Sequence, residues 1–290
     1  MKHHSTASGA LLLALTLAAS VCAAQSSALT QATQVGVGNR AAIDQTDIGK
    51  EVRANVNQTG GANHATLTQS GYWRKGIGVQ QTGNGNTSTV RQESGTSAVS
   101  TEQTGNRNRA LAVSLDTGAS SLIARQTGND NAVELVDIDG GYSGPVTEQY
   151  GNGNRIAVHQ DTVIYTTVRI TQTGDRNQVS DLHDGNRFNY TTIRQTGADN
   201  VVSARSDAEA SLAEVTQTGE RNQATTEQHQ HDSYFTIVQS GNSNTANLAQ
   251  TGMLAPPFSG NTATITQAGH HLAASLAQNG GGNQGAIVQR

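Results

Sequence analysis

The residues of this chain that are best suited to do chemistry are carboxamides. The sequence holds 26 Gln and 23 Asn, and many of them recur in the pattern Gln-x-Gly-x-x-Asn-x-Ala-x-x-x-Gln, first seen from Gln34 to Gln45. A carboxamide is not an acid, a base or a nucleophile, but it donates two hydrogen bonds and accepts two. The pattern therefore predicts hydrogen bonding between copies of a repeat rather than catalysis.

The pattern occurs in twelve copies, of which the one around Gly260 and Asn261 is degenerate. Successive Asn residues lie 22 to 24 residues apart, except for 17 between Asn244 and Asn261, where Pro256-Pro257 interrupts the repeat. The first Gln of the copies is Gln34, Gln58, Gln81, Gln103, Gln126, Gln149, Gln172, Gln195, Gln217, Gln239 and Gln278. The Gly is Gly36, Gly60, Gly83, Gly105, Gly128, Gly151, Gly174, Gly197, Gly219, Gly241 and Gly280. The Asn is Asn39, Asn63, Asn86, Asn108, Asn131, Asn154, Asn177, Asn200, Asn222, Asn244, Asn261 and Asn283, and the second Gln is Gln45, Gln69, Gln92, Gln160, Gln228, Gln250, Gln267 and Gln289.

No grouping of residues typical of an active site accompanies the repeat. His229-x-His231 and His270-His271 lie in variable loops without Cys ligands or a repeated Asp or Glu, so we interpret them as solvated polar residues rather than metal ligands. The Gly-rich segments lack the Lys and the following helix of a phosphate-binding loop. We therefore predict no catalytic residues, no metal site and no cofactor.

Apolar residues alternate within each copy, which predicts β-strands. One alternating pair follows the Asn, as in Ala65 and Leu67, and another precedes the first Gln, as in Val168 and Ile170. Each unit is thus expected to hold two short strands with one apolar side. The Gly-x-x-Asn segment between them is typical of a tight turn, because Gly and Asn tolerate positive φ.

A two-stranded unit with so thin an apolar face is stable only when it stacks on the next unit. The predicted fold is all-β: a β-solenoid of about twelve stacked strand-turn-strand repeats, with layers about 4.8 Å apart. The Gln and Asn side chains share the inward parity of the apolar residues, so we expect amide ladders from layer to layer. Asp181 occupies an inward position that is apolar in most units, either as a local irregularity or as a charge that slows aggregation.

Charged residues at the second position of the turn predict ion pairs between layers. Arg107 would face Asp130, and Asp199 would lie between Arg176 and Arg221. Each exposed pair contributes about 0.2–1 kcal/mol and would disfavour shifted registers. The alternative is a turn that accepts any polar residue.

Composition and the N-terminus set the class of protein. Of 290 residues 34% are hydrophobic and 3% aromatic, and 18 Lys+Arg against 22 Asp+Glu give no electrostatic reason to bind nucleic acid. An apolar run over 10–19, followed by small residues over 20–24, predicts a secretory signal peptide. We predict three segments: a signal peptide over 1–24, a short leader over 25–33, and a repeat solenoid over 34–290 with an irregular unit near 251–267. Export would remove Cys22, the single cysteine, so no disulfide would hold the mature chain together.

The tandem pattern behind a secretory signal resembles the curlin repeat of curli fibre subunits, and the resemblance covers nearly the whole of 34–290. It implies a bacterial protein that is secreted through an outer-membrane pore and polymerises at the cell surface into a functional amyloid for biofilm formation and adhesion. The implied partners are further copies of the chain, another curlin subunit, and the outer-membrane curli secretion pore with its accessory factors. No nucleic acid and no small-molecule substrate are expected. Familiar members have fewer units and a longer leader, and the leader is the part that addresses them to the pore.

Three roles stay open from the sequence. The first and last copies match the internal ones without an evident capping unit, which favours self-association through unpaired strand edges. Such a chain would be the fibre-forming subunit or the minor curlin that nucleates fibres at the cell surface. The third role is a monomeric solenoid that adheres to a surface. That role predicts a regular array of exposed Thr, whereas the residue after each Asn varies, as in Arg40, His64, Thr87 and Ala132.

Overall fold

The computed structural model describes residues 17–21, 29–46, 52–71, 75–93, 97–115, 118–138, 141–162, 164–185, 187–252 and 260–290. Within these ranges the chain forms 24 β-strands and no helix. The described residues accordingly include no helix that is long and apolar enough to cross a membrane.

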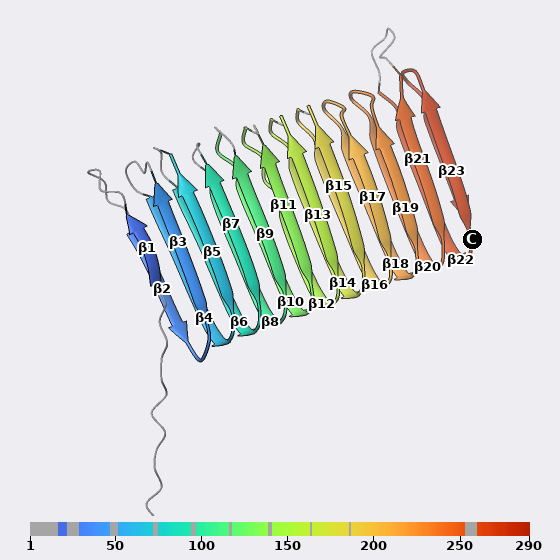
Figure 1. The fold of residues 1–290 in the computed structure, drawn as a ribbon. Coiled ribbons are helices and arrows are strands. Elements are labelled where there is room, and N and C mark those ends of the chain that lie inside the picture. Colours follow the sequence, from blue (N-terminus) through green and yellow to red (C-terminus); the bar gives the residue numbers. More distant parts are fainter. Residues whose placement is uncertain are drawn as a thin grey trace, which may run out of the picture.

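The strands form two parallel sheets of twelve strands each, which face one another along the whole molecule (Figure 1). The odd sheet contains β1 (Leu17–Val21), β3 (Arg40–Thr46), β5 (His64–Ser70), β7 (Thr87–Glu93), β9 (Arg109–Leu115), β11 (Ala132–Ile138), β13 (Arg155–Asp161), β15 (Gln178–Asp184), β17 (Val201–Ser206), β19 (Gln223–Gln228), β21 (Thr245–Thr251) and β23 (Ala273–Asn279). The even sheet contains β2 (Leu29–Val35), β4 (Val52–Gly61), β6 (Lys75–Asn84), β8 (Ala98–Asn106), β10 (Ser121–Asn129), β12 (Val146–Asn152), β14 (Thr167–Asp175), β16 (Tyr190–Ala198), β18 (Leu212–Glu220), β20 (Tyr234–Asn242), β22 (Thr262–His270) and β24 (Gln284–Gln289).

One rung of the solenoid consists of an even strand, the Gly-x-x-Asn turn and the following odd strand. Neighbouring rungs stay in register, so that Gln126 lies opposite Gln149 and Gly128 opposite Gly151. The prediction of an all-β solenoid of stacked repeats is confirmed. The described residues hold eleven complete rungs, from β2–β3 to β22–β23, and β24 adds half of a twelfth.

The core lies between the two sheets and is one side chain deep from each. Strand β10 buries Leu122 and Ala124, and β11 buries Val133 and Leu135, while the residues between them point outward. A fully buried Leu or Val contributes about 1.5–3 kcal/mol. A single rung therefore buries too little to fold alone, and its stability depends on the rungs above and below it.

The last two predicted copies are out of phase with the fold, which corrects the sequence interpretation. Gln267 lies opposite Gln239 in the even sheet, so it is a first Gln, and Gln278 lies opposite Gln250 in the odd sheet, so it is a second Gln. In the turn between them Leu272 takes the place of the Asn.

The remaining residues of those two copies lie on the opposite arc of the solenoid. Asn261 and Asn283 immediately precede β22 and β24, and Gly280 lies in the connection from β23 to β24. Gln289 pairs with Gln267 and so belongs with the first Gln residues. The rung from Asn244 to Leu272 is 28 residues long, and the sequence Asn-x-Ala-x-Ile-x-Gln after Asn261 imitates the odd strand while folding as an even one.

The N-terminal boundaries differ in part from those predicted. Strand β2 begins at Leu29, inside the predicted leader over 25–33, because 29–33 already alternate and pair with β4. The predicted signal peptide over 1–24 lies outside the described residues except for β1, which pairs with β3. The Pro256-Pro257 interruption also lies outside the described residues.

Candidate assembly site

The first Gln of every rung takes part in one continuous side-chain ladder inside the even sheet. The Nε2 of each Gln donates to the Oε1 of the next at 2.6–3.0 Å, from Gln34 through to Gln289. The second N–H crosses the core to a backbone carbonyl, as from Gln126 to Arg109 at 3.0 Å. Every bond of this ladder points the same way along the rod, from the N-terminal rung to the C-terminal one.

The turn Asn forms a second buried ladder, with the opposite donor direction. Asn131 donates its Nδ2 to Oδ1 of Asn108 at 3.1 Å, and its backbone N–H reaches the same oxygen at 3.0 Å. The Nδ2 also donates to the carbonyl of Gly151 one rung ahead at 2.8 Å. The described Asn residues from Asn39 to Asn244 follow this arrangement, and Leu272 ends it.

The motif Gly is required by the same turn. Gly128 has a φ of +121°, and a Cβ on it would lie 1.9 Å from the carbonyl oxygen of Gly151. That oxygen is the acceptor of the Asn131 amide. The Gly and the Asn of the motif therefore form one arrangement, in which the turn of one rung is held against the turn of the next.

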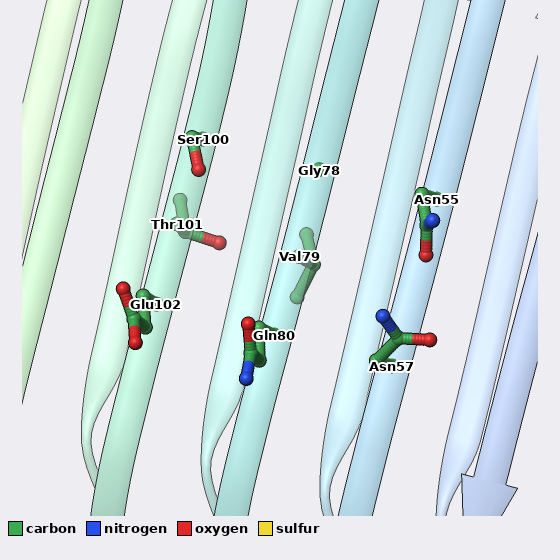
Figure 2. A pocket seen from close by; sticks show the side chains of 8 residues that line it. All are labelled: Asn55, Asn57, Gly78, Val79, Gln80, Ser100, Thr101 and Glu102. Carbon is green, nitrogen blue, oxygen red and sulfur yellow. The ribbon is translucent and has the colours of Figure 1, made fainter.

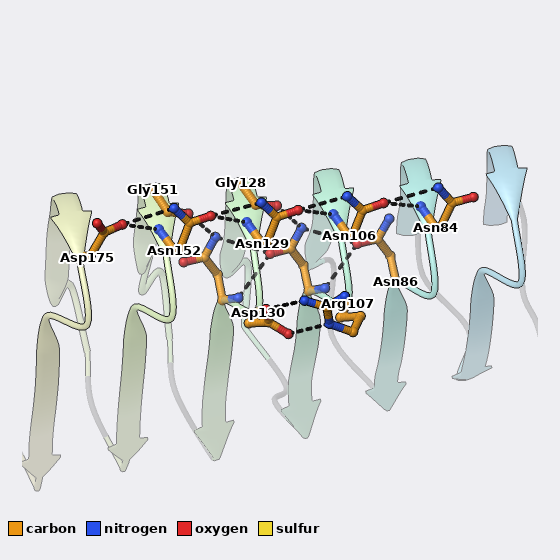
Figure 3. Close-up of polar contacts among 12 residues, drawn as sticks. Asn84, Asn86, Asn106, Arg107, Gly128, Asn129, Asp130, Gly151, Asn152 and Asp175 are labelled. Carbon is orange, nitrogen blue, oxygen red and sulfur yellow. Dashed lines mark hydrogen bonds and ion pairs between the residues drawn. The ribbon is translucent and has the colours of Figure 1, made fainter.

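A third ladder lies on the outer side of the same turn, and the sequence analysis missed it (Figure 3). Asn84, Asn106, Asn129 and Asn152 each donate their Nδ2 and backbone N–H to the side-chain oxygen one rung ahead, and Asp175 is the last acceptor. These donor–acceptor distances are 2.9–3.2 Å. The signal in the sequence is the residue after the motif Gly, which is Asn in four consecutive copies.

The second Gln forms a ladder only near the two ends of the rod. Gln45, Gln69 and Gln92 are linked at 2.8–2.9 Å, and Gln250 donates to Gln278 at 2.9 Å. Gln228 donates to Gln250 at 3.4 Å. In the five central rungs the same column is also buried, but Gln160 is its only glutamine. The column there consists of Ser114, Asp137, Gln160, His183 and Ser206.

Gln160 is the predicted ladder residue that the structure leaves outside a ladder. It is fully buried, yet neither atom of its amide has a hydrogen-bond partner among the described residues. Its neighbours in the column, Asp137 and His183, do not continue an amide chain. The sequence pattern identified Gln160 by its spacing but carried no information on the rungs on either side.

Asp181 proves to be half of a buried pair. Its Oδ2 lies 3.1 Å from Nε2 of His183, and both side chains are 1% exposed. The hydroxyl of Thr191 lies 3.2 Å from the same nitrogen, from the facing sheet. Asp181 is thus not an isolated charge but part of a small polar cluster in the middle of the core.

Two of the three predicted ion pairs in the turns are formed. Arg107 holds Asp130 through two hydrogen bonds of 2.7 and 2.6 Å, and Arg176 holds Asp199 through bonds of 2.7 and 2.8 Å. Arg221 does not reach Asp199 within the described part of the chain; it contacts Ser243 and Glu220 instead. Hydrogen bonding by Arg107 lowers the pKa of Asp130, and Arg176 lowers the pKa of Asp199 in the same way.

The Arg107–Asp130 pair should contribute a small pH-dependent stability. Since the folded-state pKa of Asp130 lies below its unfolded value, the contribution is present above the unfolded pKa and is lost as the pH falls through the folded pKa. We expect Arg107→Gln to lower the Tm slightly at neutral pH and to leave it unchanged in strong acid. Arg109→Gln, which removes an arginine without an ion-pair partner among the described residues, is the control. An equal loss for Arg107→Gln at every pH would contradict the assignment.

The outer surface of the described residues carries shallow depressions between the strands. The depression in Figure 2 lies over β4, β6 and β8 around Gly78, between Asn55 and Ser100, and contains one carboxylate, Glu102. Among the described residues no group of three or more His, Cys, Asp or Glu is arranged to hold a metal ion. The described turns present hydrogen-bonding side chains in rows along the rod.

These features define a class: a parallel β-solenoid whose rungs are joined by side-chain amides. Residues 208–252, which contain β18 to β21, match the family pattern described as the Curlin associated repeat. These residues therefore carry the curlin repeat, and the resemblance drawn from the sequence is confirmed there. No curated protein matches the chain. Both the family and the fold are structural rather than enzymatic.

Proposed function

We propose that the protein is a secreted structural subunit that polymerises end to end into curli-like extracellular amyloid fibres. The observation that carries this proposal is the state of Gln34 in the first rung. Its side chain is 6% exposed, yet its Oε1 has no hydrogen-bond partner in the described structure. In every later rung this oxygen accepts the Nε2 of the Gln one rung before it.

The opposite end of the rod supplies the missing donor. Gln289 in β24 donates one N–H to the carbonyl of Ala273 at 2.9 Å, as each inner Gln does to the odd strand of the preceding rung. The other N–H of an inner Gln reaches the next rung, and for Gln289 that place lies beyond β24. A second copy stacked head to tail would bring its Gln34 oxygen there and also pair the backbone edge of β24 with β2.

The further parts of this proposal come from the curlin family. Cleavage after Ala24, passage through the outer-membrane secretion pore with its accessory factors, co-assembly with another curlin subunit, and a role in biofilm and adhesion all belong to it. The chain would serve as the fibre-forming subunit, with the nucleating minor curlin as the alternative. Adding substoichiometric amounts of the chain to a second curlin subunit distinguishes them, because a nucleator shortens the lag without contributing most of the fibre mass.

Assembly of the purified chain tests the proposal. Residues 25–290 are expected to enhance thioflavin fluorescence. Their fibres are expected to give a diffraction reflection at about 4.8 Å, which is the strand spacing of cross-β fibres. Gln34→Leu keeps the side-chain volume but removes both the unpartnered Oε1 and the hydrogen bond from Nε2 to Gln58, so we expect several-fold slower elongation with an unchanged circular dichroism spectrum. Gln160→Leu is the matched control. A wild-type chain that stays monomeric for days at high concentration would sink the proposal.

A monomeric surface-binding rod is the second candidate, and one observation favours it. The outward residue between the first Gln and the Gly is Thr in a column of stacked, exposed positions: Thr59, Thr82, Thr104, Thr127, Thr173, Thr196 and Thr218. Tyr150 interrupts it once. This is the regular Thr array that the residues after each Asn do not provide. Persistence of monomer in the experiment above, together with adsorption to a crystalline surface, would support this role.

A further inference from the structure

Aromatic residues gather on one flank of the rod, although the chain contains few of them. Three lie in the connections that follow β11, β13 and β15: Tyr142, Tyr165 and Phe188, which are 61, 48 and 60% exposed. We call these three residues the aromatic ridge. Beside it, Tyr190, Leu212 and Tyr234 form an outward column on β16, β18 and β20, and they too are exposed. Exposed apolar patches of this kind mark interaction surfaces.

The aromatic ridge is a rigid feature rather than a set of loose side chains. The rings of Tyr142 and Tyr165 stack with centroids 5.2 Å apart, and those of Tyr165 and Phe188 with centroids 5.3 Å apart, each pair 8° from parallel. Backbone hydrogen bonds join the same connections, from Tyr165 to Gly141 at 2.9 Å and from Phe188 to Ile164 at 3.0 Å. Because the inner ring faces are occupied by each other, the ridge presents ring edges and hydroxyls to its surroundings. Both faces of the middle ring, Tyr165, are occupied in this way, so that ring offers no free face on which a sugar or nucleobase could stack.

The outer face of the odd sheet has a groove over the same part of the rod. We call it the odd-face groove; it measures about 430 Å³ and is lined by Arg109, Leu111, Ala132, Glu134, Arg155 and Ala157. Val133 and Ile156 also border it, but their side chains are buried in the core. A second depression continues it over β15, past Val136 and Leu182. The groove exists because Ala132 is small between Arg109 and Arg155 in one outward column, and Ala157 is small beside Glu134 in the next.

We propose that the aromatic ridge of one rod docks in the odd-face groove of a second copy of this chain lying beside it. The ridge is apolar at its edges, and the groove offers Leu111, Ala132 and Ala157 as its apolar floor. The two tyrosine hydroxyls need polar partners once they are removed from water, and Arg109, Glu134 and Arg155 supply them from the groove walls. Both features lie over rungs from β9 to β16, so rods side by side in register bring them to the same height.

This contact differs from end-to-end growth in its geometry and its consequence. The ridge and the groove are different surfaces, so the contact is heterologous and each rod keeps a free ridge and a free groove for further neighbours. Repetition along two stacked fibres multiplies a weak single contact into a stable one. The inference rests on the proposed function only for this repetition, and it assigns lateral bundling to residues that play no part in the amide ladders.

Two variants on opposite partners test the proposal. The ridge variant carries Tyr142→Asn, Tyr165→Asn and Phe188→Asn, because these residues have φ of 56–58° and Asn tolerates that conformation. The groove variant is Ala157→Lys, which places a long charged side chain in the groove from an outward strand position. Gly78→Lys on the other sheet is the matched control, since a Cβ there has no neighbour within 4 Å.

The readouts are bundle width in electron micrographs and elongation followed by thioflavin fluorescence. We expect both variants to elongate within about twofold of wild type and to give single filaments, while wild type and Gly78→Lys give bundles. A mixture of preformed ridge-variant and groove-variant filaments should bundle again, because each supplies the surface that the other lacks. Bundling by either variant alone, or a mixture that stays dispersed, would overturn the proposal.

Loss of elongation in the wild-type chain would contradict the proposed function instead. In that case the lateral contact is tested on monomeric rods by sedimentation velocity. Wild type and Gly78→Lys should then self-associate with a several-fold lower dissociation constant than the ridge variant. Equal dissociation constants for wild type and the ridge variant would contradict the proposal.

Discussion

Replacing Gly128 by alanine should strongly disrupt the contact between its rung and the next one. The new Cβ would lie 1.9 Å from the carbonyl oxygen of Gly151, at a φ of +121° that L residues rarely adopt. The rungs must separate, and the hydrogen bond from Asn131 to Gly151 is lost with them. Backbone strain and the unsatisfied buried amide together cost on the order of 3 kcal/mol or more. The measurement is the free energy of unfolding in urea.

Gly85→Ala is the control for that substitution. Gly85 has a φ of +67°, and its added Cβ would come no closer than 3.7 Å, to Cγ of Arg107. The equivalent position one rung earlier is already alanine, Ala62 with a φ of 54°. We expect a loss of about 1 kcal/mol or less from the left-handed conformation alone. Equal effects at Gly85 and Gly128 would show that rung contact is not what requires the motif Gly.

Two glutamines with the same burial should respond in opposite ways to replacement by leucine. Gln149 is fully buried and makes three hydrogen bonds, to Gln126, Gln172 and the carbonyl of Ala132, at 2.9–3.1 Å. Gln149→Leu leaves these partners unsatisfied in the core, so we expect a loss on the order of 3 kcal/mol. Gln160 is equally buried but its amide has no partner in the described structure. Gln160→Leu should therefore be neutral or stabilising by about 1 kcal/mol.

Chemical denaturation of both variants alongside wild type checks this pair. A large loss for Gln160→Leu would mean that its amide finds partners in solution, most directly through ordered water. A negligible loss for Gln149→Leu would mean that the even-sheet ladder does not hold the rungs together. Either result would show that the position of a Gln in the motif does not by itself predict its contribution to the free energy of unfolding.

Much of this fold follows from the sequence because one rung predicts the next. Alternation such as Leu122 and Ala124 before Gln126 is enough to predict an inward face, and the turn residues predict where each strand ends. Repetition then determines the register, since only one alignment brings Gln onto Gln and Gly onto Gly. These inferences need no information from outside the repeat.

The parts that were missed depend on interactions across arcs or between non-identical rungs. Leu272 interrupts the Asn column, and the repeat pattern instead matches Asn261, which lies on the other arc of the solenoid. Gln160 has the right spacing but lies between two residues that do not continue the ladder. The aromatic ridge does follow the repeat, since Tyr142, Tyr165 and Phe188 each lie 11 residues after the turn Asn, but it falls in connections that the sequence analysis treated only as variable loops.

Strand β1 links removal of the predicted signal peptide to the time at which the protein could assemble. It pairs with the outer edge of β3, from Leu17 against Ala41 to Val21 against Gln45, and it lies within the segment whose removal the sequence predicts. While it remains, the edge of β3 is paired and β1 is the terminal strand of the odd sheet; cleavage after Ala24 would expose the edge of β3. Proteolytic maturation would then change the edge that the odd sheet presents for assembly, from β1 in the precursor to β3 in the mature chain.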